Sequence, residues 1–493
     1  MSQKKADILS NIITYVPSRY FSQFLGFFTS LFMKRFLGPL SAGIWDLIKL
    51  IISYVDYAEL GSTLTIYYKV PVLVGQGKRE EADKIKNIVF AFIMLTSFIA
   101  SIGVLTYALI FSRKLTPQLF WGLISASLLI ILERIYTFYL VAMRAFKDYG
   151  ALSKSVCFDA VINLLLVLII VSRFKLYGLY AAIILLTILN ILYIRRNVNY
   201  HLAPLLDWKA TLAYIKFGFP LYLTSILTVL FNSIDRLMIA GFLGFQQLGF
   251  YSIAMMSKNY SHQLSTNFSH VTSPHFMEDF GKFGDSERIY KYIIKGTLTL
   301  SCFMSVVLGL IFIYSKPVIQ LTLPSFLPGL TSLRIFIFIS FLSSLMVFPT
   351  NYIVTQGKQN KLIIFSVISL AMNVILNYLF IKTGYGINGV ALASAIATLF
   401  YFLAIIIYAM KHFAAYRRIG NYLLRIFLPP LYAVSLIAAL QAVRYGGLWI
   451  TPVIRSVLFL LACILLAALV EKEAGLVSTF LDIIKKRFIK DEK

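Results

Sequence analysis

The feature that most constrains this chain is a series of apolar segments, each about as long as a helix that crosses a bilayer. Such a helix needs roughly 20 consecutive, mostly apolar residues. The 493-residue chain contains 14 segments of this kind, near 10–33, 43–68, 88–111, 119–143, 155–172, 176–194, 217–240, 247–270, 293–315, 332–354, 361–382, 386–410, 424–443 and 448–470. Only 14% of the residues are charged, whereas a soluble domain is about one quarter charged. The sequence therefore excludes a soluble globular enzyme and predicts an all-α polytopic membrane protein with 14 transmembrane helices.

The connections between these segments carry an alternating charge bias that predicts their orientation. Cytoplasmic loops of membrane proteins accumulate Lys and Arg. With a cytoplasmic N-terminus, 30 of the 46 Lys and Arg residues fall in inside segments and nine fall in outside loops. The net charge of +25 is thus explained by topology rather than by a nucleic-acid partner. We expect a multi-pass protein of the cell membrane (plasma or inner membrane) with both termini in the cytoplasm.

A weak internal repeat predicts the domain organisation. Phe36-Leu37-Gly38 recurs as Phe242-Leu243-Gly244, and Tyr177-Gly178 recurs as Tyr385-Gly386, at offsets of 206 and 208 residues. An offset of six spans keeps both halves in the same orientation, which is a parallel-repeat architecture used by transporters. We predict an N-lobe of six helices over 1–200, a C-lobe of six helices over 201–415 and two appended helices over 416–472. Residues 473–493 are predicted to form a basic amphipathic helix on the cytoplasmic leaflet.

The second predicted helix carries a polar face. Ionisable groups inside a span usually face the bundle interior or a water-filled cavity. Polar residues recur here at spacings of three or four, which places them on one side of a helix; they are Asp46, Lys49, Ser53, Asp56, Glu59 and Thr63. We expect this face to line a cavity, with the carboxylates of Asp46, Asp56 and Glu59 as candidates for ion coupling.

Basic residues inside the spans predict an anion-binding cavity. They are Arg19, Lys49, Arg134, Lys258, Arg236 and Arg334. An uncompensated buried charge costs several kcal/mol unless something pairs with it, so a surplus of cations favours an anionic ligand such as phosphate or pyrophosphate. Two other interpretations stay open. Each cation could pair with a carboxylate, as Lys49 could with Asp46, and Arg236 and Arg334 could extend to the membrane interface.

Motifs for catalysis, nucleotide binding and metal binding are missing from the sequence. There is no Gly-x4-Gly-Lys-Ser/Thr loop and no His-Glu-x-x-His motif. Cys157, Cys302 and Cys463 lie in apolar runs, and His262 and His270 lack further ligands nearby. We expect no enzyme activity, no cofactor and no metal site, and transport that is passive or driven by a gradient or the membrane potential.

Several motifs, in their order along the chain, resemble a known family. They are Leu37-Gly38-Pro39, Gly43-Ile44-Trp45, Glu59-Leu60-Gly61, Gly218-Phe219-Pro220-Leu221, Asp235-Arg236-Leu237-Met238-Ile239, Gly244, Gly249, Tyr251-Ser252-Ile253-Ala254, Gln356-Gly357-Lys358, Asn373, Asn377 and Tyr385-Gly386-Ile387-Asn388-Gly389-Val390-Ala391-Leu392-Ala393. Together they look like the polysaccharide transporter family, the O-antigen and capsule repeat-unit flippases of the multidrug/oligosaccharidyl-lipid/polysaccharide flippase superfamily.

The resemblance implies a function and a mechanism. It implies alternating access through a cavity between two lobes, and translocation of a polyprenyl-pyrophosphate-linked oligosaccharide from the cytoplasmic to the outer leaflet. In the similar lipid II flippases, arginines of helix 1 contact the pyrophosphate, and Arg19 best fits that role here. The expected partners are the lipid-linked oligosaccharide, membrane lipids, and a polysaccharide polymerase and glycosyltransferases. Two alternatives stay open: a cation-coupled multidrug exporter of the same fold and a lipid II flippase.

Overall fold

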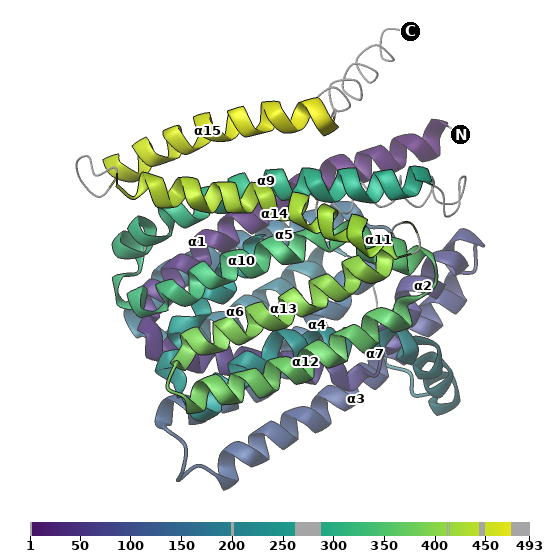
Figure 1. The fold of residues 1–493 in the computed structure, drawn as a ribbon. Coiled ribbons are helices and arrows are strands. Elements are labelled where there is room, and N and C mark those ends of the chain that lie inside the picture. The colour runs from purple at the N-terminus through teal and green to yellow at the C-terminus, as the bar shows by residue number, and fades with distance from the viewer. Residues whose placement is uncertain are drawn as a thin grey trace. The chain divides into compact units, whose positions relative to one another are not determined.

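The computed structural model describes residues 2–198, 202–261, 287–411, 413, 415–442 and 449–474. Throughout these ranges the regular secondary structure is helical, and no strand occurs in them (Figure 1). Nine helical segments of the described residues are long and apolar enough to cross a membrane. The predicted all-α membrane fold is therefore confirmed, while the count of 14 spans stays a prediction.

The helices form two compact units, Met1–Gly249 and Phe250–Lys493. The first unit contains α1 (Ser2–Val55), η1 (Asp56–Glu59), α2 (Ser62–Gly75), α3 (Arg79–Ile110), α4 (Pro117–Ala145), α5 (Tyr149–Leu166), η2 (Val167–Val171), α6 (Ser172–Asn197) and α7 (Trp208–Phe242). A further helix covers 245–261, and the division between the two units falls within its sequence. The lobes predicted over 1–200 and 201–415 are drawn from the sequence repeat and stay a prediction.

The second unit continues the helical pattern. It contains α9 (Glu287–Thr322), η3 (Pro324–Gly329), α10 (Leu330–Leu345), α11 (Val347–Thr355), α12 (Gln359–Lys382), α13 (Gly386–Met410), α14 (Tyr416–Leu440) and α15 (Ile450–Ala474). Within it α12 and α10 pack against α13, and α14 and α15 pack against α9. Residues 475–493, which make up most of the tail predicted over 473–493, lie outside the described residues.

Two of the predicted loops are kinks in long helices. α1 passes through the predicted loop at 34–42 with a single non-helical residue, Gly38, at φ 70°. In α6 the equivalent break is Lys175, at φ 51°. Gly244, which the sequence repeat pairs with Gly38, also has a positive φ of 86°. The backbone thus agrees with the first anchor of the repeat.

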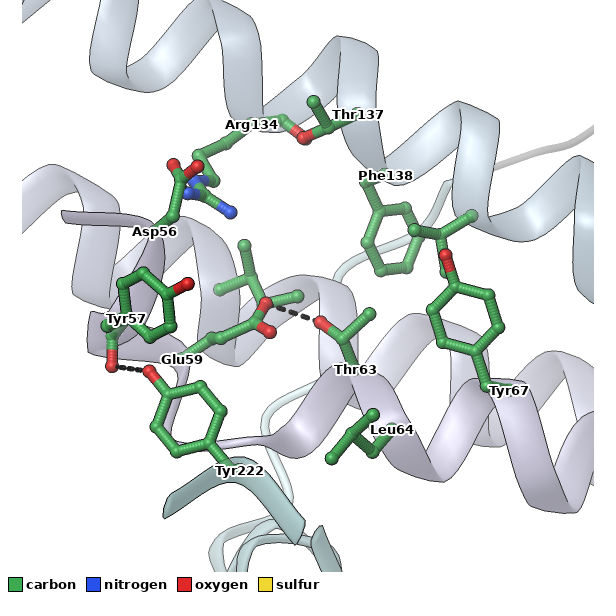
Figure 2. Close-up of a pocket in the computed structure, with 12 residues that line it drawn as sticks. Asp56, Tyr57, Glu59, Thr63, Leu64, Tyr67, Arg134, Thr137, Phe138 and Tyr222 are labelled. Carbon is green, nitrogen blue, oxygen red and sulfur yellow. Dashed lines mark hydrogen bonds and ion pairs between the residues drawn. The ribbon is translucent and has the colours of Figure 1, made fainter. Parts of the chain in front are cut away.

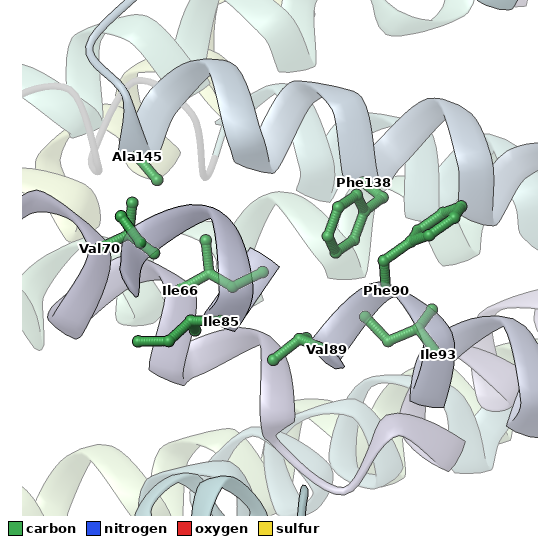
Figure 3. Close-up of a cluster of buried hydrophobic side chains, with 9 residues drawn as sticks. Ile66, Val70, Ile85, Val89, Phe90, Ile93, Phe138 and Ala145 are labelled. Carbon is green, nitrogen blue, oxygen red and sulfur yellow. The ribbon is translucent and has the colours of Figure 1, made fainter. Parts of the chain in front are cut away.

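An apolar cluster fixes α4 against α2 and α3 in the first unit (Figure 3). Its buried members are Ile66, Val70, Ala82, Ile85, Val89, Phe90, Ile93, Phe138 and Ala145. The rings of Phe90 and Phe138 lie 4.9 Å apart between centroids. Since lipid tails are as apolar as these side chains, the cluster stabilises the helix contacts through close packing rather than through removal from lipid. Phe138 extends from this cluster to the wall of the pocket described below.

Hydrogen bonds between helices stabilise the second unit. The amide of Asn377 donates to Oδ1 of Asn373 at 2.6 Å, and the amide of Asn373 donates to Oγ of Ser394 at 3.1 Å. Ser369 donates to the carbonyl oxygen of Ala397 at 2.7 Å. The bonds from Asn373 to Ser394 and from Ser369 to Ala397 connect α12 to α13, as polar side chains do between membrane helices, and the bond from Asn377 holds the Asn373 amide within α12.

Candidate functional site

The candidate site forms where α1 ends and the chain turns into α2. The α-helix stops at Val55, the 3-10 turn η1 follows, and Leu60 and Gly61 take left-handed conformations with φ of 50° and 81°. Glycine enters this region without the steric cost that a Cβ brings, so Gly61 suits the second position. The predicted helix over 43–68 is therefore interrupted after Val55. Its polar residues before this point lie in α1, and those after it lie in η1 and α2.

A close glycine contact holds α7 against this break. A Cβ on Gly218 of α7 would overlap the carbonyl oxygen of Gly61, and a Cβ on Gly61 would lie 2.8 Å from Cβ of Tyr222. Tyr222 follows Gly218 by one helical turn, and its hydroxyl donates to the carbonyl oxygen of Tyr57. The ring centroids of Tyr57 and Tyr222 are 5.5 Å apart. The glycine pair thus lets α7 supply one wall of the site.

The result is a pocket of about 300 Å³ in the first unit (Figure 2). Its walls come from η1, α2, α3, α4 and α7. It is lined by Asp56, Tyr57, Glu59, Thr63, Leu64, Tyr67, Ile93, Arg134, Thr137, Phe138, Val141 and Tyr222. Figure 2 shows Tyr57 and Tyr222 near one end and Phe138 and Tyr67 toward the other, with Glu59 between them.

The charges in the pocket are partly compensated. Arg134, whose side chain is 11% exposed, forms an ion pair with Asp56, whose side chain is 50% exposed. Glu59 accepts a hydrogen bond from the hydroxyl of Thr63. With two carboxylates and one guanidinium, the lining carries a formal charge of −1. The predicted cation Arg134 is thus paired, as the sequence analysis left open, and this pocket has no cationic surplus.

Hydrogen bonds continue from the pocket toward the end of α4. Arg144 donates to the hydroxyl of Tyr67 at 3.2 Å. Thr137 donates to the carbonyl oxygen of Glu133 at 2.7 Å, which uses its hydroxyl proton within α4. Sequence alone does not single out Tyr67 or Tyr222, because aromatic residues are frequent in this chain and only the tertiary structure places these two at the pocket.

A second group of ionisable side chains lies in the first unit. Lys34 is 5% exposed and interacts electrostatically with Asp46 and Lys49. Glu133 of α4 interacts electrostatically with Lys49 and Asp159. Asp46 and Lys49 of the predicted polar face therefore belong to this group, and Asp56 and Glu59 belong to the pocket.

The position of Lys34 differs from the one that the predicted spans imply. The spans over 10–33 and 43–68 place it in an outside loop, but it lies inside α1, one helical turn before the Gly38 kink. The signal that could have located it is the lack of any turn-forming cluster between 25 and 37.

The other predicted cations do not converge on the pocket. Arg19 and Lys49 are exposed on α1. Lys258 lies over the ring of Phe336 at 5.9 Å. Arg334 lies over the ring of Phe312 at 4.5 Å.

Several arginines have a buried nitrogen without a hydrogen bond, and Arg236 and Arg334 are among them. The Nε atoms of Arg236 and Arg334 have no hydrogen-bond partner among the described residues. Among all the predicted site residues, the structure brings Asp56, Glu59 and Arg134 together in one pocket.

Metal-binding side chains do not cluster in the part of the chain that the structure describes. Within the described ranges no group of three His, Cys, Asp or Glu side chains could hold a metal ion. His262 and His270 lie outside the described residues.

Comparison with known proteins gives one family match. A family model described as polysaccharide biosynthesis protein matches residues 33–326. No curated protein sequence matches the chain.

Solved structures match the fold over most of the chain. A lipid II flippase, MurJ, in an inward closed conformation has a TM-score of 0.74 at 14% identity, covering 94% of this chain and 99% of its own. An inward-facing MATE family multidrug resistance transporter of the MOP superfamily has a TM-score of 0.63 at 16% identity, covering 80% and 94%. A MOP superfamily transporter from Pyrococcus furiosus has a TM-score of 0.53 at 15% identity, covering 84% and 96%. At these identities the likeness shows the fold, which is that of MOP superfamily transporters.

Proposed function

Because the chain belongs to the polysaccharide biosynthesis protein family and has the fold of MOP superfamily transporters, we propose that it is a flippase for a polyprenyl-pyrophosphate-linked oligosaccharide. It moves this lipid from the cytoplasmic to the outer leaflet of the cell membrane for surface polysaccharide biosynthesis. The observation that carries the proposal is a polar, charged pocket inside an apolar helical unit of a chain from this family. Such a pocket gives a hydrophilic head group a place away from lipid.

The pyrophosphate is assigned to cations outside the pocket. Arg19 and Lys49 are exposed on α1, and phosphate oxygens accept strong, charge-assisted hydrogen bonds from such groups. Arg236, Lys258 and Arg334 are further candidates from the same prediction. Arg134 is a weaker candidate, because its guanidinium is paired with Asp56.

Alternating access gives a role to two glycines, Gly43 in α1 and Gly249 in the helix over 245–261. A Cβ at Gly43 would overlap the carbonyl oxygen of Phe245, and a Cβ at Gly249 would overlap the carbonyl oxygen of Pro39. Gly43 and Gly249 are 206 residues apart, the same offset that relates Phe36-Leu37-Gly38 to Phe242-Leu243-Gly244. In the proposed mechanism this crossing separates and re-forms when the two predicted lobes change their orientation.

An ion gradient is the proposed energy source. Moving one charge across the membrane potential changes the free energy by about 2.3 kcal/mol per 100 mV. Asp46, Asp56 and Glu59 are the candidate coupling carboxylates. The cytoplasmic location of both termini, and a polymerase and glycosyltransferases as partners, belong to the same proposal.

Binding by the purified protein tests the proposed substrate. The probes are an undecaprenyl-pyrophosphate oligosaccharide, a neutral glycolipid and a lipophilic cation. We expect preference for the pyrophosphate lipid and a loss of about tenfold or more in Lys49→Ala and in Arg19→Ala, since a hydrogen bond to a charged group contributes about 1.5–3 kcal/mol. Lys114→Ala, which removes an exposed lysine beside Phe111, is the control. Unchanged affinity in the Arg19→Ala/Lys49→Ala variant would reject the proposed anion site.

Two other functions have a specific observation in their favour. The pocket's formal charge of −1 and the fold of a MATE transporter fit a cation-coupled multidrug exporter, which would confer drug resistance on a sensitive host and lose it in Glu59→Gln. The TM-score of 0.74 with MurJ fits a lipid II flippase, which would complement a strain that lacks this activity.

A further inference from the structure

The negative formal charge of the pocket makes it unsuitable for binding a pyrophosphate. Asp56 and Glu59 both line it, and Arg134 is the basic side chain in its lining, already paired with Asp56. A pyrophosphate placed here would lie next to the Glu59 carboxylate, and like charges at short range in a medium of low dielectric repel strongly. The pocket therefore suits a part of the substrate other than its pyrophosphate.

The hydrogen-bonding groups of the pocket suit hydroxyl groups. Carboxylates accept hydrogen bonds, guanidinium groups donate them, and hydroxyl groups do both. Asp56 and Glu59 supply acceptors, Arg134 supplies donors, and the hydroxyl of Tyr67 already accepts a bond from Arg144. A sugar ring, with hydroxyl groups around its rim, can satisfy both kinds of partner at once.

Part of the pocket lining is apolar. Leu64, Ile93, Phe138 and Val141 belong to it, together with the ring of Tyr67. Figure 2 shows Phe138 and Tyr67 at the same end, opposite Tyr57 and Tyr222. The C–H faces of a pyranose are apolar although its rim is polar, so this combination of aromatic rings and charged groups matches both surfaces of a sugar.

The volume of the pocket accommodates one sugar ring. The pocket measures about 300 Å³, which is at the small end of the range of roughly 300–1,000 Å³ for ligand pockets. It has no room for an oligosaccharide together with a polyprenyl chain. A single residue of the glycan fits.

We propose that the pocket between η1, α2, α4 and α7 binds one uncharged hexose ring of the lipid-linked glycan, while the pyrophosphate binds elsewhere. Glu59 and Asp56 accept hydrogen bonds from ring hydroxyls, Arg134 donates to one, and Tyr67 and Phe138 pack against the ring. The inference rests on the proposed flippase function and names the part of the substrate that this site recognises.

A lipophilic organic cation is the competing ligand for such a pocket. A single carboxylate among aromatic rings would attract it. The guanidinium of Arg134 in the wall opposes it, and the threonine and tyrosine hydroxyls of the lining have no role in binding it. The pocket composition therefore favours the sugar, and the cation becomes an outcome of the test.

The test compares lipids that differ only in the sugar. The probes are undecaprenyl pyrophosphate without sugar and with a single glucose, galactose or N-acetylglucosamine, bound to the full-length protein in nanodiscs. We expect at least one sugar to raise the affinity by about tenfold, the equivalent of 1.4 kcal/mol, and this ratio to fall to about one in Glu59→Gln and in Tyr67→Leu. Glu287→Gln, at an exposed glutamate paired with Lys291, and Tyr385→Leu, at an exposed tyrosine, should keep the ratio.

A photoreactive sugar locates the ring independently of any variant. Undecaprenyl pyrophosphate carrying a diazirine-modified hexose should crosslink to peptides that contain residues 56–67 or 134–141. Crosslinks confined to other helices would overturn the inference.

The outcomes distinguish the inference from the function on which it rests. Equal affinity for all four lipids, with or without sugar, would reject the sugar site and leave the flippase proposal standing. Failure of every pyrophosphate lipid to bind would reject the flippase proposal itself. Displacement of the sugar lipid by tetraphenylphosphonium, with a matching loss of tetraphenylphosphonium binding in Glu59→Gln, would reject the sugar in favour of an organic cation.

Discussion

Replacing Gly218 with alanine tests whether the glycine contact holds the pocket wall in place. The added Cβ would overlap the carbonyl oxygen of Gly61, which is a backbone atom and cannot rotate away. Overpacking of this kind costs about 1–3 kcal/mol. Gly103→Ala is the matched control, because Gly103 also lies inside a helix, α3, and has open space where its Cβ would be.

The difference between Gly218→Ala and Gly103→Ala gives the free-energy cost of disturbing the contact between Gly218 and Gly61. Alanine favours helix over glycine by about 1 kcal/mol, and both variants share that gain. The free energy of unfolding of Gly218→Ala should therefore lie about 1–3 kcal/mol below that of Gly103→Ala. It can be measured by titration with SDS in mixed micelles. We also expect Gly218→Ala to weaken glycan-lipid binding, because Tyr222 is carried on the same turn of α7.

Equal unfolding free energies for the two variants would refute this reasoning. They would mean that α7 moves away from the α1–α2 break at no cost. The position of Tyr222 would then depend on some other contact, such as the 2.6 Å hydrogen bond between Tyr54 and Ser233.

Two further predictions concern the ion pair and the helix crossing. A double-mutant cycle of Asp56→Asn and Arg134→Gln should give a coupling of about 1–2 kcal/mol in the free energy of unfolding. This value lies between those of exposed and buried ion pairs, because the Asp56 side chain is 50% exposed. Additive effects of the two substitutions would mean that the pair does not stabilise the fold. Gly43→Val and Gly249→Val should each slow lipid flipping in proteoliposomes by about tenfold or more, because a cost of 1.4 kcal/mol at the crossing corresponds to that factor. Gly241→Val, where a Cβ has open space, should flip lipid at the normal rate, and equal rates in all three variants would dismiss the crossing as a moving contact.

Sequence reasoning located the helices and the polar residues but not their partners. Asp46, Lys49, Asp56 and Glu59 recur at helical spacing, which correctly indicated polar positions inside the helices. The spacing also placed them on one face of one helix. The end of α1 at Val55 divides them, because Asp46 and Lys49 lie in the α-helix and Asp56 and Glu59 lie in the 3-10 turn that follows it.

The partners of the charges depended on contacts between distant parts of the chain. Arg134 pairs with Asp56, although 78 positions separate them in the sequence. Lys34 interacts with Asp46 across the Gly38 kink. Periodicity describes one helix at a time, so it gave no means of predicting which charges meet across helices.

The sequence by itself determined that this chain is a bundle of membrane helices. A backbone in lipid satisfies its hydrogen bonds only within a helix or a closed barrel, so long apolar segments leave few choices of fold. Only the tertiary structure decided which polar groups form a site. The glycine contact between Gly61 and α7 and the packing of Phe138 of α4 against Phe90 of α3 bring together side chains from five elements. That convergence arises from shape complementarity between helices, which is a property of the packed surfaces and not of any one segment.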